Sequence, residues 1–350
     1  MKKFVSLTLA ALMLMGLLSG CGSSQGSTSA AASGSSAAAS SAAGSKPSYE
    51  ITMTSFDSTG TVACQLGEKF AGLVKDKSDG RIVINFYPDA TLGTETEQYD
   101  LVKSGETQIC YFADSFGSQI ASGYDPSIIP FLFTSVEDVE KLYGSDLGQS
   151  IRKAALENGN VYLLGTSRRS PRLLTANKAI NTPADLKGLK LRVPEIQAWV
   201  TVWNSMGASC TVVSWSETYS ALQTGVVDGQ ENPIDNIFAN KIYEVNKYIM
   251  KTEHLQSLNH WVVNNDFWTS LDAEDQELLS SCFQEAADWA NGALAELSDK
   301  YFKDVTADGS VTVLDVDKAQ FQAAAQAGIE TVKATLQPEA QTYIDAYLKG

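Results

Sequence analysis

Two arginines, Arg172 and Arg192, stand twenty residues apart, and each lies at the edge of a predicted strand. Arg192 belongs to Leu189–Val193, where apolar and basic residues alternate, and Pro194 ends this strand because proline cannot donate to a strand ladder. A guanidinium at the end of a strand in an α/β sheet faces a crevice, and its planar fork suits a carboxylate. The alternative for each arginine is an ion pair that only stabilises the fold.

Two further residues fit the same crevice. Trp215 follows a predicted strand, and Asn232 lies in a predicted loop after the minimal strand Val226–Val227. A few polar anchors beside apolar and aromatic walls are typical of a cleft for a small organic anion. For Trp215, a cleft wall and the hydrophobic core are equally open interpretations, whereas Trp199 and Trp203 are predicted to pack against a sheet.

Catalysis has less support from the sequence. Asp228 and Glu231 could act as a paired acid and base, which keeps a surface-anchored carbohydrate hydrolase as an alternative function. Both lie in the predicted loop Asp228–Pro233, however, where carboxylates commonly stabilise turns. His254 and His260 are isolated, and no phosphate-binding or dinucleotide-binding glycine motif occurs. We therefore expect no catalytic residue, no cofactor and no metal site.

The elements that must position these residues alternate between strands and helices. Strands are predicted at Tyr49–Phe56, Arg81–Tyr87 and Ile109–Phe112, and helices at Thr61–Lys77 and Thr94–Lys103. This order indicates a parallel sheet covered on both faces, and a second α/β unit follows it. A helix predicted at Ala273–Lys303 would be roughly 45 Å long, which suggests that it lies across two domains.

The first residues have the pattern of a targeting segment. Lys2 and Lys3 precede the apolar stretch Phe4–Leu18, which is too short to span a membrane and remain there. Leu18–Cys21 resembles a bacterial lipobox, so we expect a signal peptide at residues 1–20 and lipidation of Cys21. Residues 21–48, rich in Ser, Ala and Gly, are then predicted to form a tether outside the membrane.

Composition limits the class of partner. The formal charge is −15, from 26 basic and 41 acidic residues, which argues against nucleic acid and against an anionic membrane surface. Contact with the membrane is therefore expected through the lipid anchor only. The remaining cysteines have no CxxC spacing and are predicted to be mostly buried free thiols: Cys64, Cys110, Cys210 and Cys282.

Four motifs, in their order and spacing, resemble the DctP-type extracytoplasmic solute receptors of tripartite ATP-independent periplasmic (TRAP) transporters. They are Arg172–Asn177, Gly188–Pro194, Ser216–Thr224 and Val227–Pro233. The resemblance covers nearly everything after the tether. It implies an α/β, two-lobed fold like that of periplasmic binding proteins, with hinge strands and a long helix spanning both lobes. We expect lobe I at residues 49–169 plus about 258–297, and lobe II at 170–257 plus about 298–350.

The resemblance also implies roles for single residues. Arg192 matches the arginine that pairs with the substrate carboxylate, Arg172 a second basic anchor, Asn232 an amide near the same carboxylate and Trp215 an aromatic lining position. The first lobe matches less well. Phe56 and Ala113 stand where sialic-acid-binding relatives have polar contacts, and Glu95 and Asp114 are the polar candidates nearby. This departure argues against sialic acid as the ligand.

The function implied by the resemblance is binding rather than catalysis. A lipid-anchored, monomeric, extracytoplasmic receptor would capture a small organic acid by hinge closure and deliver it to the membrane subunits of a TRAP permease. A receptor for an ATP-driven ABC importer would share the fold class and is a further alternative. C4-dicarboxylates, uronates or aldonates, and keto acids all stay open as ligands, and so does the number of carboxylates that the arginines hold.

Overall fold

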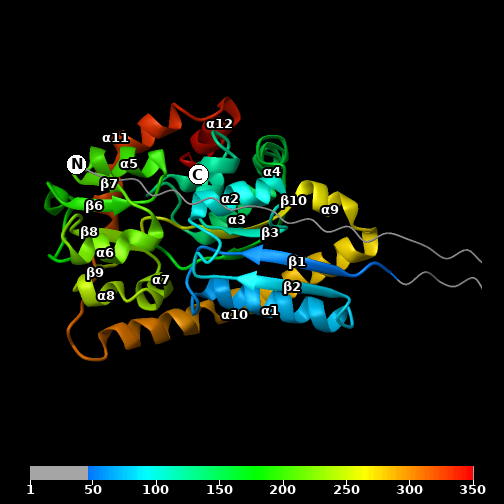
Figure 1. The fold of residues 1–350 in the computed structure, drawn as a ribbon. Helices are drawn as coiled ribbons and strands as arrows, with labels where there is room; N and C mark the ends of the chain where they lie inside the picture. Colours follow the sequence, from blue (N-terminus) through cyan, green and yellow to red (C-terminus); the bar gives the residue numbers. More distant parts are fainter. Residues whose placement is uncertain (1–45, 350) are drawn as a thin grey trace, which may run out of the picture. The chain divides into compact units, whose positions relative to one another are not determined.

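Two β-sheets form the framework of the computed structural model, which describes residues 46–349 (Figure 1). The first sheet has the strand order β2-β1-β3-β10-β4 and the second the order β11-β9-β5-β8-β6-β7. The first contains β1 (Tyr49–Thr54), β2 (Ile82–Tyr87), β3 (Ile109–Phe112), β4 (Val161–Arg168) and β10 (Leu258–Asn264). The second contains β5 (Leu173–Ala176), β6 (Lys190–Val193), β7 (Ser209–Val212), β8 (Gly229–Asn232), β9 (Tyr248–Met250) and β11 (Thr312–Leu314).

Helices cover both sheets, as the alternating sequence pattern predicted. Those beside the first sheet are α1 (Val62–Lys77), α2 (Glu95–Ser104), α3 (Val136–Gly144), α4 (Asp146–Gly159) and α9 (Asn265–Ser270). Those beside the second are α5 (Gln197–Ser205), α6 (Thr218–Gln223), α7 (Ile234–Ala239), α8 (Ile242–Val245) and α11 (Lys318–Lys333). Helix α12 (Pro338–Tyr347), which the sequence did not predict, contacts α4 and α11.

The strands that lead to the site run in parallel. Strand β1 pairs in parallel with both β2 and β3, while β10 is antiparallel to β3 and β4. In the second sheet, β6 pairs in parallel with β7 and β8. Because parallel strands end at one edge, each sheet gathers the residues that follow its strands into one place.

The chain crosses between the sheets in three places, as expected of a two-lobed fold with hinge strands. The first crossing lies between β4 and β5 and the second between β9 and β10. These two segments are hydrogen-bonded to each other, because Arg169 N donates to Ser257 O (3.2 Å) and Arg172 N donates to Leu255 O (3.2 Å). The third crossing is made by α10.

Helix α10 (Ala273–Thr306) has 34 residues, is capped by Asp272 and runs beneath both sheets in Figure 1. It packs against α1 and β4 in one part and against α7 in another. At 1.5 Å per residue its length is about 51 Å, so the prediction of a helix that crosses both halves is confirmed.

Two hydrophobic clusters lie on opposite faces of the sheets, and each draws residues from both of them. Neighbouring strand residues alternate between the clusters: Phe112 belongs to one and Tyr111 to the other, and Leu174 and Leu173 divide in the same way. Residues 47–350 form one compact unit that holds both clusters. Within the described residues, no helix is both long and apolar enough to cross a membrane.

One prediction about local structure is wrong. The segment predicted as the loop Asp228–Pro233 contains strand β8, which is antiparallel to β5 and fully buried. Gly229 permits this pairing, because a Cβ atom there would lie 2.4 Å from Thr175 O. The four cysteines from Cys64 onward are free and all but Cys210 are buried, whereas the signal peptide, Cys21 and the tether to residue 45 lie outside the described residues.

Candidate functional site

A cavity lies between the carboxyl ends of the parallel strands of the two sheets. All seven residues predicted from the sequence as ligand-binding line it: Phe56, Glu95, Asp114, Arg172, Arg192, Trp215 and Asn232. The other lining residues are Asp57, Ala113, Ser115, Arg169, Pro194, Ile196 and Trp199. The structure therefore brings together residues that are up to 176 positions apart in the sequence.

Arg192 is the cation of this cavity that has no anionic partner. Its side chain is 3% exposed, and its Nε donates to Val213 O at 2.9 Å. Among the described residues, no carboxylate oxygen lies within 4.0 Å of its nitrogens. Burial lowers the pKa of Arg192 to about 10, and the charge of Arg172 lowers it further, whereas the more distant charges of Glu231 and Glu95 act in the opposite direction. Two guanidinium nitrogens are thus free to hold an anion.

Trp215 forms a wall beside this arginine. The Arg192 guanidinium lies 5.5 Å from the centre of the indole ring, so the ring face supports the cation. The indole N–H of Trp215 is buried and has no acceptor among the described residues. The sequence left open whether Trp215 belongs to the cleft or to the core, and in the structure it lines the cavity and also packs against one of the hydrophobic clusters.

Arg172 lines the same cavity, but its guanidinium is hydrogen-bonded to acceptors of the protein. Its Nε donates to Glu231 Oε2 (2.6 Å), its Nη1 to Asp114 Oδ2 (2.9 Å) and its Nη2 to Asn232 Oδ1 (2.9 Å). The guanidinium also lies 4.6 Å from the ring centre of Trp199. Arg172 therefore links the two sheets and orients Asn232, and most of its donors are occupied without a ligand.

Arg169, which the sequence analysis did not select, belongs to the same network. It donates to Asp114 Oδ2 (2.9 Å) and to Asn236 Oδ1 (3.0 Å), and Asn236 in turn donates to Asp57 Oδ1 (2.8 Å). The only signal in the sequence was that Arg169 is close to Arg172. Asp57 gave no signal of its own, since a carboxylate after a strand is common in turns.

Glu95 stands at the start of α2, opposite Arg192. Ser115 Oγ donates to its carboxyl group, and Glu95 lines both this cavity and an adjoining one. Burial raises the pKa of Glu95 to about 7, although the hydrogen bond from Ser115 and the charge of Arg192 act in the opposite direction. Near neutral pH this group is therefore divided between its protonated and ionised forms.

Asp228 and Glu231 do not form the acid–base pair of a hydrolase. Glu231 is completely buried and bound to Arg172 and His254, whereas Asp228 is partly exposed and lies 3.5 Å from Lys190 Nζ. Burial alone would raise the pKa of Glu231, but the Arg172 charge and hydrogen bonds with His254 and Arg172 lower it to about 2. Glu231 therefore acts as a structural anion rather than a proton donor.

The cavity at Arg192 is narrow, with a volume of about 30 Å³, which is room for one or two water molecules. It adjoins a wider cavity of about 210 Å³. The two share Glu95, Ser115, Arg192, Pro194, Ile196 and Trp215. Arg192 and Glu95 therefore line both spaces.

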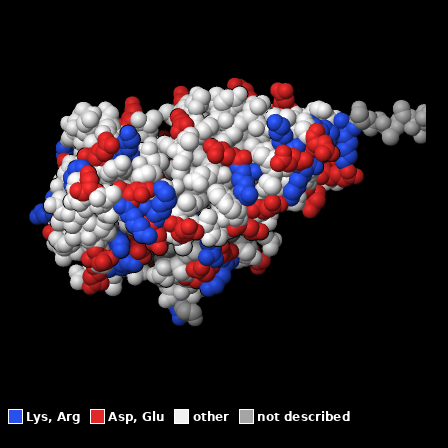
Figure 2. Space-filling model, turned by 90° about the horizontal axis from the view of Figure 1, so that it is seen from below, with Lys and Arg blue, Asp and Glu red and all other residues white. Residues whose placement is uncertain are grey.

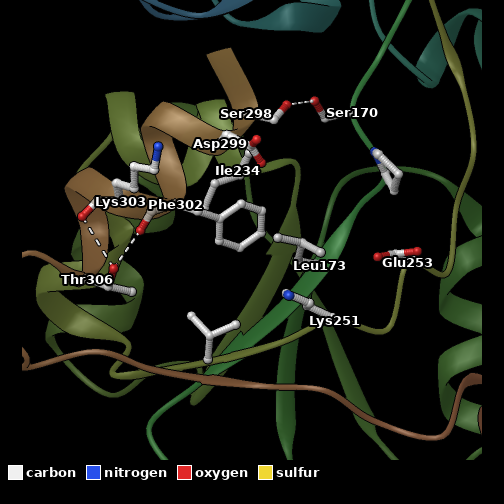
Figure 3. Close-up of a pocket in the computed structure, with 12 residues that line it drawn as sticks. Ser170, Leu173, Ile234, Lys251, Glu253, Ser298, Asp299, Phe302, Lys303 and Thr306 are labelled. Atoms are coloured by element: carbon white, nitrogen blue, oxygen red, sulfur yellow. Dashed lines mark hydrogen bonds between the residues drawn. The ribbon is translucent and has the colours of Figure 1, made fainter. Parts of the chain in front are cut away.

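A larger cavity of about 520 Å³ lies between α10 and the hinge segments (Figure 3). In Figure 3, Ser170 and Ser298 face each other across one end, joined by a 2.8 Å hydrogen bond. Of its four charged residues, Lys251 and Glu253 pair with Asp315 and Lys318, and Asp299 and Lys303 are exposed. This cavity offers no buried unpaired charge, so the cavity at Arg192 is the better candidate despite its smaller volume.

Residues 46–349 contain no cluster of three or more His, Cys, Asp or Glu side chains that could hold a metal ion. On the face seen in Figure 2, acidic side chains lie beside basic ones, and no continuous basic surface is formed. The unpaired positive charge of the site is instead inside the cleft.

Comparison with known proteins agrees with this geometry. The model of the family "Bacterial extracellular solute-binding protein, family 7" matches residues 54–336. A solute-binding protein of Roseobacter denitrificans is 31% identical over 75% of this chain and 79% of its own. The C4-dicarboxylate-binding periplasmic protein of Rhodobacter capsulatus is 29% identical over 66% of this chain and 70% of its own.

Solved structures show the same two-lobed fold. A TRAP periplasmic solute-binding protein of Sulfitobacter with bound β-D-galacturonate has a TM-score of 0.80 and 26% identity, over 86% of this chain and 100% of that one. The Roseobacter denitrificans protein with bound L-galactonate has a TM-score of 0.78 and 27% identity, over 86% and 99%. The resemblance that the four motifs indicated is thus confirmed: this chain belongs to the bacterial extracellular solute-binding proteins of family 7, the family of the DctP-type TRAP receptors.

Proposed function

We propose that this protein is an extracytoplasmic receptor that binds a small organic acid and delivers it to the membrane subunits of a TRAP transporter. The observation that carries the proposal is the buried Arg192 guanidinium, which has no carboxylate within 4.0 Å among the described residues and lines a narrow cavity. A buried charge without a partner is costly, and a ligand carboxylate would supply one. Relatives of similar fold with bound galactonate and galacturonate support this class of ligand.

The ligand carboxylate binds the fork of Arg192 beside Trp215, while Phe56, Glu95 and Asp114 contact the ligand from the first sheet. Arg172 holds Asn232 at the site. Its main role is to position Asn232 rather than to contact the ligand directly. We assign lobe I to residues 49–169 plus about 258–297 and lobe II to 170–257 plus about 298–350. The ligand bridges these lobes, so its contacts favour the closed form.

The remaining proposals concern the setting of the receptor. Lipidation at Cys21, after removal of residues 1–20, anchors the protein at the outer side of the cell membrane. The Ser/Ala/Gly-rich tether sets how far the folded part can extend from the membrane. The protein acts as a monomer, its partners are the ligand and the integral-membrane permease subunits, and it catalyses no reaction. Both the hydrolase and the ABC-importer interpretations lose their support with the site geometry and the family assignment.

The proposal is tested by a thermal-shift screen of residues 47–350 against organic acids, followed by calorimetry on Arg192→Ala. An acid at about 100 times its dissociation constant should stabilise the wild-type unit by roughly 2.7 kcal/mol. In Arg192→Ala we expect affinity for that acid to fall by about 30-fold to several thousand-fold, because a desolvated charge-assisted pair is worth about 2–5 kcal/mol.

Arg192→Lys is the matched variant, since it keeps the charge but loses the planar fork. It should also bind much more weakly than the wild type, because an ammonium group cannot make the bidentate contact. If no acid in the screen binds, or if Arg192→Ala binds the acid as tightly as the wild type, the proposed function is wrong.

A further inference from the structure

The wall opposite Arg192 includes several hydrogen-bond acceptors. Carboxyl groups from three places in the first sheet line the cavity: Asp57 after β1, Glu95 at the start of α2 and Asp114 after β3. The neighbouring cations are already used, because Arg169 and Arg172 both donate to Asp114 Oδ2. Beyond Arg192, the cleft therefore offers an incoming ligand carboxyl acceptors rather than free cationic donors.

One of these acceptors is buried without a donor. Asp114 is 5% exposed, and its Oδ1 atom has no hydrogen-bond partner in the described structure, although Oδ2 accepts two guanidinium donors at 2.9 Å. Buried polar atoms without partners are rare, because leaving one unpaired is unfavourable. A hydroxyl group of a ligand could donate to Oδ1, whereas a keto oxygen or a carboxylate could not.

The wall therefore discriminates among acids by the charge of the acid and by the hydrogen-bond donors that it carries. A ligand whose carboxylate is held by Arg192 would bring any second carboxylate against Asp57, Glu95 and Asp114, which repel it when they are ionised. Hydroxyl groups at the same places would donate to these carboxyl groups. The geometry does not favour bare aliphatic acids either, since they would leave Asp114 Oδ1 unpaired.

We propose that this site selects acids that combine a single carboxylate with several hydroxyl groups, and disfavours both dicarboxylates and acids without hydroxyls. The inference rests on the proposed function above and narrows the ligands that the sequence left open. Polyhydroxy monocarboxylates satisfy both walls at once: the carboxylate is held by Arg192, and the hydroxyls are held by the carboxyl groups of the first sheet.

Matched pairs of acids test the inference by calorimetry on residues 47–350 at pH 7.5. D-Galactonate is compared with galactarate, and D-gluconate with D-glucarate. The two acids of each pair have the same carbon chain and differ in the number of carboxylate groups. D-Galacturonate, D-glucuronate, butyrate and succinate complete the set. We expect the tightest ligand to be a polyhydroxy monocarboxylate, and any aldonate that binds to exceed its dicarboxylate partner by about 30-fold or more.

The outcomes separate the two proposals. If the tightest ligand is galactarate, glucarate, succinate or butyrate, and its binding still depends on Arg192, the selectivity inference is overturned while the receptor function stands. If none of these acids binds, the selectivity inference is overturned. If, in addition, no other organic acid in the thermal-shift screen binds, the proposed function is overturned as well. A polyhydroxy monocarboxylate as the tightest ligand, with its dicarboxylate partner much weaker, supports both.

Glu95→Gln tests the wall itself, and Glu195→Gln is the matched control. Glu195 lines the adjoining cavity but is exposed, whereas the Glu95 carboxyl group faces Arg192. Removing the Glu95 charge should reduce the preference for the monocarboxylate by about tenfold, and removing that of Glu195 should change it by less than about threefold. Equal effects of the two variants, or no effect of Glu95→Gln, would contradict the assigned role of the inner carboxyl groups.

Discussion

The guanidinium of Arg172 is surrounded by acceptors, whereas that of Arg192 has a single backbone carbonyl as its partner. Both side chains are 3% exposed and line one cavity, so burial alone does not distinguish them. The difference lies in the carboxylates: Arg172 neutralises Glu231 and Asp114, and Arg192 neutralises none within 4.0 Å. One arginine therefore stabilises the fold, and the other is available to a ligand.

This contrast predicts opposite effects on stability and binding. Arg172→Ala should lower the free energy of unfolding by about 3–5 kcal/mol, because it leaves Glu231 and Asp114 buried without their shared partner. Arg192→Ala should leave stability unchanged or raise it, because it removes a buried cation that has no counterion. Urea unfolding of both variants without ligand provides the measurement. Equal destabilisation by the two substitutions would show that Arg192 is also a structural ion-pair partner.

The protonation of Glu95 predicts how binding depends on pH. Its pKa is raised to about 7 by burial, and the groups that act on it are Asp57, Arg192 and Arg169. A bound anion beside Arg192 offsets the positive charge that lowers this pKa, so binding takes up a proton above pH 7, and the protonated carboxyl group still accepts a ligand hydroxyl through its carbonyl oxygen. Affinity for the acid should then decrease by up to about tenfold between pH 6 and pH 8, since the ionised form must first be protonated.

Calorimetry across this pH range checks the sign, and Glu95→Gln is the control for other titrating groups. In that variant the dependence should disappear, because no proton has to be taken up at position 95. An affinity that rises with pH in the wild type, or a dependence that persists in Glu95→Gln, would assign the titration to a different group.

At the scale of elements, the sequence predicted most of what surrounds the site. The parallel strands of the first sheet, strand β6 with Arg192 and the long helix α10 follow from hydrophobic periodicity, which depends only on local pattern. Strand β8 was missed because Gly229, Gln230, Glu231 and Asn232 have the composition of a turn. Their burial depends on distant partners, such as Thr175 for Gln230 and Arg172 for Glu231.

The same reasoning explains which site residues escaped prediction. Asn236 accepts a hydrogen bond from Arg169 and donates one to Asp57, and it belongs to α7, far from both in the sequence. No local pattern encodes such a network, because its members become neighbours only when the two sheets meet. Arg192 could be predicted because a lone arginine at the end of a strand already points to the edge where sheets bind ligands.

The attachment of α10 to the first sheet gives a prediction at this scale. Arg81 forms an ion pair with Asp275 in the first turn of α10, and the Asp275 carboxylate is almost completely buried. Arg81→Ala should therefore lower the free energy of unfolding by about 2–4 kcal/mol, because it leaves a buried carboxylate unpaired. Lys77→Ala is the control, since Lys77 pairs with Glu285 of the same helix at an exposed position and should cost less than about 1 kcal/mol. Urea midpoints that fall equally in both variants would contradict this account.

At the scale of the whole molecule, the cleft is narrowest between Arg192 and Asp114. Both side chains are almost fully buried, and the space beside them is about 30 Å³, which is too small for an organic acid. A space of about 210 Å³ adjoins it and is also lined by Arg192, so a ligand that contacts both Arg192 and Asp114 needs the two walls to separate. The two hydrogen-bonded hinge segments and α10 cross between the sheets, and α12 contacts helices beside both of them.

Ligand binding should make the molecule more compact in solution. If the walls separate by motion of the lobes, the free protein samples open forms, and the contacts of the bound acid with both walls shift the population toward the closed one. Small-angle X-ray scattering of residues 47–350 should show a smaller radius of gyration at saturating ligand than without it. Arg192→Ala at the same ligand concentration should keep the larger value, because its weak binding cannot supply the free energy of closure. An unchanged radius in the wild type, measured while calorimetry shows the site to be saturated, would mean that entry requires only local movement at Glu95 and Trp215 rather than motion of the lobes.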